Sequence, residues 1–324
     1  MFKLIKSSLA LTVIFISLSS FANEDCSSVD FRTNFPLQIR NQKSLAWCFA
    51  HSSADNLQFA EKTPIQISAA DIAINYGKSS SSKIINLFQR WTNQNSNGED
   101  RPSEYGLAKF ASQMIIDQGY CPESSFPSED WIRVTPDGET SSVEIAVAAK
   151  EIYAIAAAIK NHRIDGLQQL PYFYQFKNIN AELFYNLLAK TEKNKILDEI
   201  RKTACDPDRV PFKSKIGVSM KITLNGMLTK MNKSLTDGHA LSVDVYSQIF
   251  SNIDNNKNKL TNLHTVMVYG RKYDVIRKQC LYLVKNSYSD DCTGYDPRLH
   301  CDKGYLWFPG SVLKKNMTSA NFYN

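Results

Sequence analysis

The chain has 324 residues, of which 43% are apolar and 22% are charged, so it can bury a large core and does not have the composition of a disordered protein. Its formal charge of +6 falls to +4 without Lys3 and Lys6, which lie in the N-terminal segment described next. That excess is too small and too dispersed to predict a nucleic-acid or membrane partner.

Residues 1–22 have the pattern of a secretory signal peptide. Two lysines precede an apolar run at 9–18, and Ser20 and Ala22 are small residues of the kind that a signal peptidase reads. The run is short for a membrane-spanning helix, and Cys26 lacks the small preceding residues of a lipoprotein site. We therefore expect cleavage after Ala22, a mature chain without a membrane anchor, and a secreted or periplasmic location.

In such a compartment thiols pair into disulfides, and this chain has seven cysteines, an odd number. One should stay free, which leaves up to three bridges among the other six and fifteen possible pairings. Cys292 with Cys301 would close a short loop, and Cys121 with Cys205 would fasten the segment between them, but the sequence does not choose. No Cys-x-x-Cys pair occurs, so we predict no metal and no cofactor.

The first part of the mature chain has helical patterns. They predict helices from Cys48 to about Lys62, from Ser68 to Tyr76 and from Glu104 to Gln118, with a short helix at 84–91 inside a polar surface loop. Ser68 and Asp71 form a capping box for the second helix, and Gly77 ends it.

The later part of the chain changes from helical to strand patterns. Helices are predicted at 142–160, 181–190 and 192–204, the last two with Asn180 and Thr191 as N-caps, so residues 128–215 form a helical subdomain. A helix at 224–235 follows, and then strands at 240–246, 265–269 and 280–284. Helices first and strands later is an α+β order, unlike a doubly wound parallel sheet.

Four residues in this framework suggest thiol chemistry. Cys48 starts a helix, where the helix dipole and free backbone N–H groups stabilise a thiolate. His264 opens one strand and Asn286 follows the next, so a hairpin can set an imidazole beside a carboxamide that orients it. Gln42, six residues before Cys48, can donate its amide to an oxyanion beside the Cys48 N–H.

These residues resemble the papain-like cysteine peptidase family. Its pattern is a glutamine six residues before the catalytic cysteine, an aromatic residue after it, a histidine opening a later strand, and Asn-Ser-Trp after the following strand. Here these are Gln42, Cys48-Phe49, His264 and Asn286-Ser287-Tyr288. Glu123-Ser124-Ser125-Phe126-Pro127 resembles the family's Glu-Ser-x-Tyr-Pro, and 241–245 resembles the strand before the histidine.

The resemblance implies a two-lobed α+β fold with a helical lobe and an antiparallel β lobe. In the family the histidine follows the cysteine by about 130 to 150 residues; here the separation is 264 minus 48, or 216 residues. We assign the excess to a helical insertion. The expected division is a signal peptide at 1–22, a helical lobe with the nucleophile at 23–127, the insertion at 128–215 and a β-rich lobe at 216–324, with 23–324 forming one domain overall.

Several departures from the family pattern accompany the resemblance. The family motif Cys-Gly-Ser-Cys-Trp reads Leu45-Ala46-Trp47-Cys48-Phe49 here, and Tyr288 replaces the tryptophan that shields the asparagine. The glycine wall for substrate has only a partial counterpart at Asn97-Gly98, and the family's long inhibitory prosegment is missing. Endopeptidase specificity is therefore not carried over.

The sequence thus predicts a secreted, monomeric cysteine-type peptidase that acts on a peptide or protein substrate. Its catalytic residues would be Cys48, His264, Asn286 and Gln42. Two alternatives stay open: a catalytically silent binding protein of the same fold, and a transglutaminase-like acyl transferase, which uses the same triad. The insertion at 128–215 is expected to cover part of the cleft or to set specificity.

Overall fold

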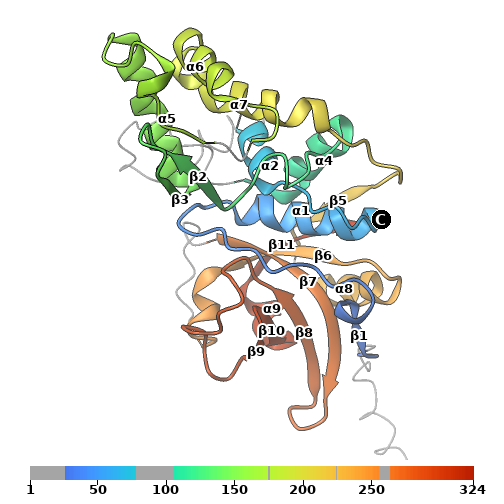
Figure 1. Ribbon diagram of the computed structural model, residues 1–324. Coiled ribbons are helices and arrows are strands. Elements are labelled where there is room, and N and C mark those ends of the chain that lie inside the picture. The colour runs from blue at the N-terminus through green and yellow to red at the C-terminus, as the bar shows by residue number, and fades with distance from the viewer. Residues whose placement is uncertain (1–25, 78–105, 174–175, 224, 255–262) are drawn as a thin grey trace, which may run out of the picture.

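The structure is a computed structural model that describes residues 26–77, 106–173, 176–223, 225–254 and 263–324. The predicted signal peptide, the short helix at 84–91 and Asn97-Gly98 lie outside these ranges. Helices and a small sheet occupy one half of the molecule, a large sheet occupies the other, and helix α1 runs between them (Figure 1).

The described residues before 128 form three helices: α1 (Cys48–Glu61), α2 (Ala69–Tyr76) and α4 (Ala108–Gln118). Lys62 ends α1 in the left-handed conformation, with its N–H bonded to carbonyls of the last turn. The Ser68 hydroxyl accepts from the Asp71 N–H and so caps α2 as predicted. The first two predicted helices are confirmed; the third, expected from Glu104, begins at Ala108, after the described and non-helical Gly106 and Leu107.

The segment 128–215 contains three longer helices and also a small sheet. The helices are α5 (Ile145–Lys160), α6 (Ala181–Lys190) and α7 (Ile196–Cys205). Three antiparallel strands lie beside them in the order β3-β2-β4: β2 (Asp130–Val134), β3 (Thr140–Glu144) and β4 (Tyr172–Phe173).

Two predictions for this segment are wrong. The helix expected from Ser142 begins at Ile145, because residues 140–144 pair with β2 across a turn at Gly138, whose φ of +87° suits glycine. The helix expected at 192–204 begins at Ile196 after a 3-10 turn, and Thr191 ends α6 instead of capping α7. The Asn180 cap is confirmed, since its side chain accepts from the Leu183 N–H.

The second half of the chain forms one antiparallel sheet. Its described strands are ordered β5-β11-β6-β7-β8-β10-β9, and β1 pairs with β7. The strands are β1 (Val29–Asp30), β5 (Val218–Lys221), β6 (Leu241–Tyr246), β7 (Leu263–Asp274), β8 (Gln279–Lys285), β9 (His300–Asp302), β10 (Tyr305–Pro309) and β11 (Met317–Tyr323). Helices α8 (Met227–Thr236) and α9 (Gly310–Asn316) accompany them. The predicted α+β class with an antiparallel sheet is therefore confirmed.

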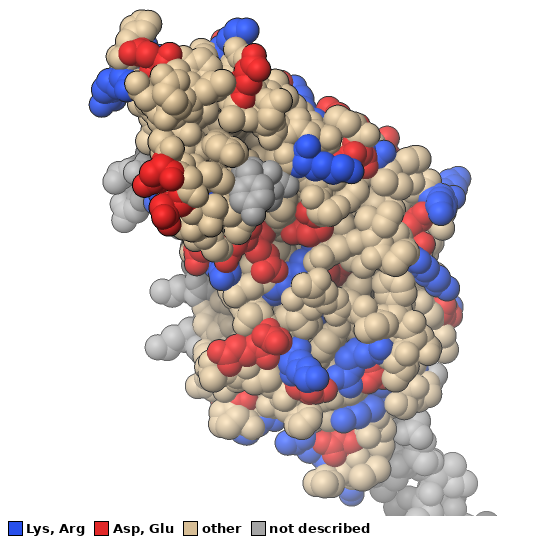
Figure 2. All heavy atoms as spheres, viewed as in Figure 1, with Lys and Arg blue, Asp and Glu red and all other residues tan. Residues whose placement is uncertain are grey.

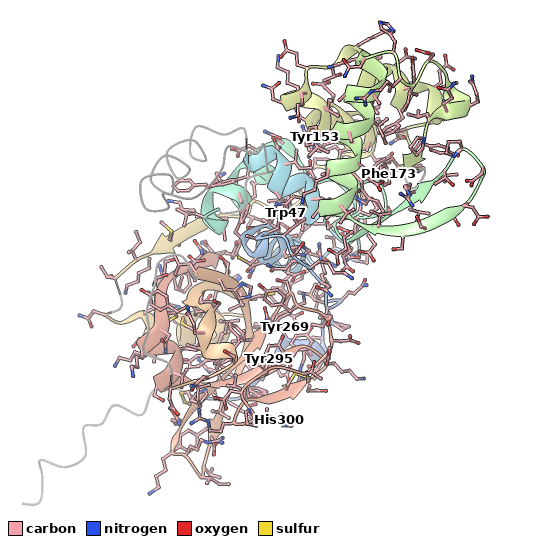
Figure 3. All side chains as sticks on the ribbon, turned by 90° about the vertical axis from the view of Figure 1, so that its left-hand side faces the viewer. Trp47, Tyr153, Phe173, Tyr269, Tyr295 and His300 are labelled. Carbon is pink, nitrogen blue, oxygen red and sulfur yellow. A yellow bond between two sulfur atoms is a disulfide. The ribbon has the colours of Figure 1, made fainter. Side chains whose placement is uncertain are left out.

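Each half has its own hydrophobic core, and a smaller third cluster packs Phe59 of α1 against Tyr269 of β7 and Leu283 of β8. One core joins α1, α2 and α4 to the segment 128–215, where the rings of Phe126, Trp131 and Phe176 pack together. The other fills the large sheet and its helices. Figure 3 shows Trp47 near the junction, with Phe173 in the first half and Tyr269 in the second. The segment 128–215 thus shares its core with α1, which carries Cys48, and with α2 and α4.

Three disulfides are present: Cys26–Cys280 and Cys121–Cys205 link distant parts of the chain, and Cys292–Cys301 closes a short loop. Cys48 is the free cysteine, as the odd count predicted. Within the described ranges, no helix has both the length and the apolar character needed to span a bilayer.

Candidate active site

Cys48 is the first residue of α1 and lies against strand β7. Its side chain is largely buried, at 8% exposure. Burial raises the pKa of the thiol to about 11, the negative charge of Asp244 adds to that rise, and the backbone and hydroxyl of Thr265 and the N–H of Phe49 partly offset it. At neutral pH the Cys48 side chain is therefore a protonated thiol.

His264 and Asn286 form a hydrogen-bonded pair. His264 lies on β7 and Asn286 directly follows β8, and the antiparallel pairing of these strands brings the two side chains together. His264 Nε2 is 2.7 Å from Asn286 Oδ1. Because an amide oxygen only accepts, Nε2 carries the proton, and Nδ1 is the nitrogen that can accept one.

The Asn286 amide is itself fixed in orientation. Its oxygen also accepts from the Ser287 N–H at 2.9 Å, and its Nδ2 donates to the Tyr295 hydroxyl at 3.1 Å. Burial lowers the pKa of His264 to about 4, and the bond to Asn286 offsets only part of that effect. The imidazole is thus held neutral in one tautomer at neutral pH.

Two aromatic rings enclose the imidazole. Tyr288 stacks on His264 with ring centroids 5.1 Å apart and planes 23° apart, and Phe250 meets it edge-on at 5.4 Å. Tyr288 is 43% exposed, so it forms the outer side of this enclosure. Tyr288 thus covers His264, whereas the sequence had placed it as the counterpart of a tryptophan that shields the asparagine.

Gln42 lies next to the same strand end. Its backbone N–H bonds the Ser287 carbonyl at 2.8 Å, and its Oε1 accepts from the Ser287 hydroxyl at 2.6 Å. Its Nε2 donates to the Leu45 carbonyl at 2.9 Å and makes a long contact of 3.4 Å to the Tyr288 hydroxyl. One amide hydrogen is therefore engaged, and the weakly bonded one is available to a substrate oxygen.

The four residues named from the sequence are brought together to different degrees. His264 and Asn286 are in direct contact, and Ser287 and Tyr288 connect them to Gln42. Cys48 touches β7 at Thr265, the residue after His264. Among the described residues, the Cys48 sulfur and the His264 ring are not joined by a hydrogen bond.

Sequence reasoning did not single out Asp244, Thr265 or Tyr295. Tyr295 lies in a loop, and no pattern pointed to its bond with Asn286. Asp244 did carry a signal, because it is an acidic residue within a predicted buried strand. No group of three or more His, Cys, Asp or Glu side chains in the described ranges could hold a metal ion.

A buried charged cluster lies further along α1. Its members are Arg40, His51, Asp55, Glu123 and Lys285. Asp55 accepts from Lys285 and lies 3.2 Å from Arg40 Nη2, while Arg40 Nη1 is 3.6 Å from Glu123. The His51 ring has no hydrogen-bond partner in the described structure, and burial together with these cations lowers its pKa well below the usual value.

Comparisons with known proteins gave matches to solved structures alone. No family model matches the chain, and no curated protein does. A recombinant stem bromelain precursor is 13% identical (TM-score 0.47, covering 92% of this chain and 70% of that one). The cysteine protease Amb a 11 of ragweed pollen in its proform is also 13% identical (0.48, 91% and 65%).

A third solved structure is similar over nearly its whole length. The Carica candamarcensis cysteine protease in complex with E-64 is 12% identical to this chain, with a TM-score of 0.46, and the match covers 92% of this chain and 97% of that one. The chain spans a smaller share of the proforms, 65% for Amb a 11.

Proposed function

We propose that this chain is a secreted cysteine peptidase of the papain-like kind, in which Cys48 attacks the carbonyl carbon of a peptide bond. The observation that carries the proposal is a free thiol at the start of a buried helix, against the strand that carries His264, whose enclosed ring is hydrogen-bonded to Asn286. The order of Gln42, Cys48, His264 and Asn286 along the chain supports the same conclusion.

The electrostatics favour general-base catalysis over a preformed ion pair. Burial disfavours both the thiolate and the imidazolium, so the proton leaves Cys48 as the sulfur attacks and is taken up at His264 Nδ1. Asn286 holds the other ring nitrogen throughout. The Cys48 N–H and the Gln42 amide hydrogen that makes the long contact to the Tyr288 hydroxyl would bind the oxyanion.

The remaining steps return the protein to its resting state. His264 gives its proton to the leaving amine, which releases the first product and leaves a thioester on Cys48. Water then attacks the thioester, with His264 accepting its proton, and the acid product departs as the thiol is restored. Peptides or proteins are the proposed substrates, and the monomer is the proposed active form.

A silent binding protein is the second candidate, and the burial of Cys48 is the observation that favours it. Its cleft would recognise a peptide without cleaving it. The two candidates separate in one assay, because only the enzyme turns its substrate over.

Hydrolysis of a peptide mixture by the chain starting at Asn23 tests the proposal. We expect cleavage products with the unmodified chain and none with Cys48→Ala, while His300→Ala, at a distant histidine (Figure 3), retains full activity. Equal turnover by Cys48→Ala and the unmodified chain would contradict the assignment of Cys48 as the nucleophile. Peptide binding without products in either chain would favour the silent protein.

Secretion and the proposed division of the chain have separate tests. The N-terminal sequence of exported protein should begin at Asn23. The proposed lobes are 23–127 and 216–324, with 128–215 as the insertion. Because this insertion shares a core with α1 and α2, replacing the exposed Thr140 and Ser142 of β3 is a safer probe of specificity than deleting it. An unchanged substrate range would argue against a role in specificity.

A further inference from the structure

A groove opens on the β-rich half of the molecule, away from the candidate active site. It has a volume of about 620 Å³ and lies between the β7–β8 turn and the chain that leads into β9. His300, on its border, lies far from Trp47, the residue before Cys48 (Figure 3). The volume is within the range of about 300 to 1,000 Å³ that is typical of ligand sites. The groove can therefore hold several side chains of another molecule without involving the proposed catalytic residues.

The base and one wall of this groove are apolar. Leu281 of β8 and Trp307 of β10 are buried at its base. The wall is formed by the β7–β8 turn, where Tyr273, Val275 and Ile276 are 48%, 74% and 89% exposed. Neighbouring apolar side chains that stand in solvent beside a groove are typical of a contact surface, because covering them removes apolar area from water.

Two cations of the groove have N–H groups to spare. Lys272 Nζ lies 4.0 Å from the centre of the Trp307 ring, and within the described ranges it forms no ion pair. Arg277 donates through Nη1 to Asp274 at 2.9 Å, which leaves most of the five N–H groups of its guanidinium for another acceptor. Arg298, in contrast, is already bonded to two carboxylates. Figure 2 shows Lys and Arg side chains gathered, with acidic ones between them, over the part of the molecule where Figure 1 places β8, β9 and β10.

The carboxylates in and around the groove are occupied. Asp274 accepts from two backbone N–H groups of the β7–β8 turn and from the Arg277 guanidinium. On adjoining strands, Asp30 of β1 and Asp302 of β9 both accept from Arg32. The groove thus offers charged donors beside an apolar wall. A complementary ligand has anionic acceptors as well as apolar groups.

We propose that this groove binds an acidic segment of a partner protein, whose carboxylates bond Lys272 and Arg277 and whose apolar side chains cover Val275 and Ile276. An extended peptide suits both surfaces, because its side chains alternate in direction and can present carboxylates to one wall and apolar groups to the other. A sulfated glycan would bond the cations but leave the apolar wall in water. Binding here does not require Cys48, so it is a function in addition to the proposed hydrolysis.

Fluorescence anisotropy with a labelled peptide in which glutamate and leucine alternate tests the proposal. The protein is the chain starting at Asn23 with Cys48→Ala, which cleaves nothing under the proposed mechanism. We expect binding that weakens as salt is added, because the attraction between exposed charges is screened. Lys272→Glu with Arg277→Glu should weaken it at least about tenfold. The matched control is Lys230→Glu, at another lysine that lies over an aromatic ring, which should leave the affinity unchanged.

Two further peptides separate charge from apolar contact. A peptide in which lysine replaces glutamate should not bind, because the groove is cationic. A peptide in which serine replaces leucine should bind at least about fivefold more weakly, because it leaves the apolar wall exposed. Val275→Ser with Ile276→Ser should remove this preference for leucine over serine.

A fluorescent dye attached at the wall locates the bound peptide. Because Cys48 is the free cysteine, a chain with Cys48→Ala and Ile276→Cys has one thiol to label. The glutamate–leucine peptide should change the emission of an environment-sensitive dye at this position. The same dye attached through Val147→Cys, at a half-exposed position of α5, should not respond.

Several outcomes overturn this inference, and none of them depends on hydrolysis. They are no binding of the glutamate–leucine peptide, equal binding of the lysine–leucine peptide, and unchanged affinity in the folded double variant, or in Lys272→Gln where the double variant does not fold. A heparin fragment that displaces the peptide, together with equal affinity for the serine peptide, assigns the groove to polyanionic glycans and also overturns it. A chain that binds the acidic peptide but hydrolyses nothing supports the groove and contradicts the peptidase proposal alone.

Discussion

Two stretches of helix α1 are equally buried but have opposite electrostatic surroundings. Its first residue, Cys48, adjoins β7, where Thr265 carries no charge and burial keeps His264 neutral at neutral pH. Two turns later, Asp55 lies between two cations, Arg40 and Lys285, whose side chains are each 1% exposed. One helix therefore supports an uncharged reaction site and a charged cluster.

The same contrast between a charged and an uncharged environment occurs at the end of strand β8, between the consecutive residues Lys285 and Asn286. Lys285 faces the charged cluster, whereas Asn286 faces His264, because consecutive side chains of a strand point to opposite faces. Charge persists in a buried place only where opposite charges meet, and the cluster around Asp55 meets that condition. No such pair of opposite charges lies at the candidate site, so under the proposed mechanism the charges on Cys48 and His264 form only transiently. The cluster around Asp55, in contrast, is permanently charged.

The candidate site formed by Gln42, Cys48, His264 and Asn286 is called the neutral site below. The largest expected effect is a loss of activity when this site is changed. His264→Ala should lower kcat/KM by at least about 10³-fold, because the proton acceptor is lost. Its unfolding midpoint in urea at neutral pH should stay near that of the parent, since no charge is left unpaired. Peptide hydrolysis and urea unfolding measure the two quantities. A loss below about tenfold would contradict the role of His264 as base.

The next effect is on stability, at the charged cluster. Asp55→Ala leaves Arg40 and Lys285 without their shared anion and should cost about 3 to 5 kcal/mol of unfolding free energy. The double variant Asp55→Leu with Lys285→Met removes an anion together with one of its cations. It should lose less unfolding free energy than Asp55→Ala. Urea unfolding at neutral pH gives both values.

An exposed ion pair supplies the control for this comparison. Lys233 and Asp237 pair on the surface of α8, with side chains 75% and 43% exposed. Asp237→Ala should change stability by less than about 1 kcal/mol. If Asp55→Ala lost no more unfolding free energy than Asp237→Ala, the charged cluster would contribute no more to stability than an exposed ion pair.

Acid should weaken the neutral site through His264. The folded-state pKa of about 4 lies below the ordinary 6.5, so unfolding favours protonation, and the stability from the neutral ring is complete above pH 6.5 and lost as the pH falls toward 4. The loss by pH 4 should be about 3 kcal/mol. His51 acts in the same direction, while the raised pKa values of Asp244 and Glu123 act in the opposite one.

A variant without the ring isolates this contribution. His264→Gln should lose less stability than the parent between neutral pH and pH 4, by about 3 kcal/mol. The measurement is the urea unfolding free energy at a series of pH values. Parallel pH profiles for the two chains would show that the ring does not resist protonation in the folded state.

Much of this fold could be predicted because its signals are local. Ser68 and Asn180 cap helices through bonds within one turn, and an odd count of cysteines predicted a free thiol. His264 and Asn286 could be paired because they lie on strands joined by one hairpin. The two caps and the hairpin pair each lie within a short stretch of sequence, whereas the cysteine count needs only the composition of the chain.

The features that escaped prediction depend on register or on competition between structures. Asp244 meets Thr265 only because β6 and β7 pair at one particular register, which the sequence pattern does not specify. Ser142 belongs to an alanine-rich stretch with helical spacing, yet it pairs with Ile132 in a hairpin, so tertiary pairing overrides local propensity. Tyr295 reaches Asn286 from a loop.

The smallest effect expected is that of one neutral hydrogen bond at the reaction site. The Ser287 hydroxyl donates to Gln42 Oε1 at 2.6 Å and helps to orient the amide proposed to bind the oxyanion. A bond between uncharged groups contributes about 1 kcal/mol, so Ser287→Ala should lower kcat about fivefold and leave KM unchanged. Leu45 still holds the amide in place through its carbonyl.

Gln42→Ala gives the upper bound for this comparison, with an expected loss of about 10²-fold in kcat because the donor itself is removed. Steady-state kinetics on one peptide substrate compares the two variants. If Ser287→Ala were as damaging as Gln42→Ala, the hydroxyl would be essential to orientation, and the neutral site would tolerate lost partners as poorly as the charged cluster. A fivefold loss instead means that the site is held by several weak contacts, whereas the cluster depends on one shared anion.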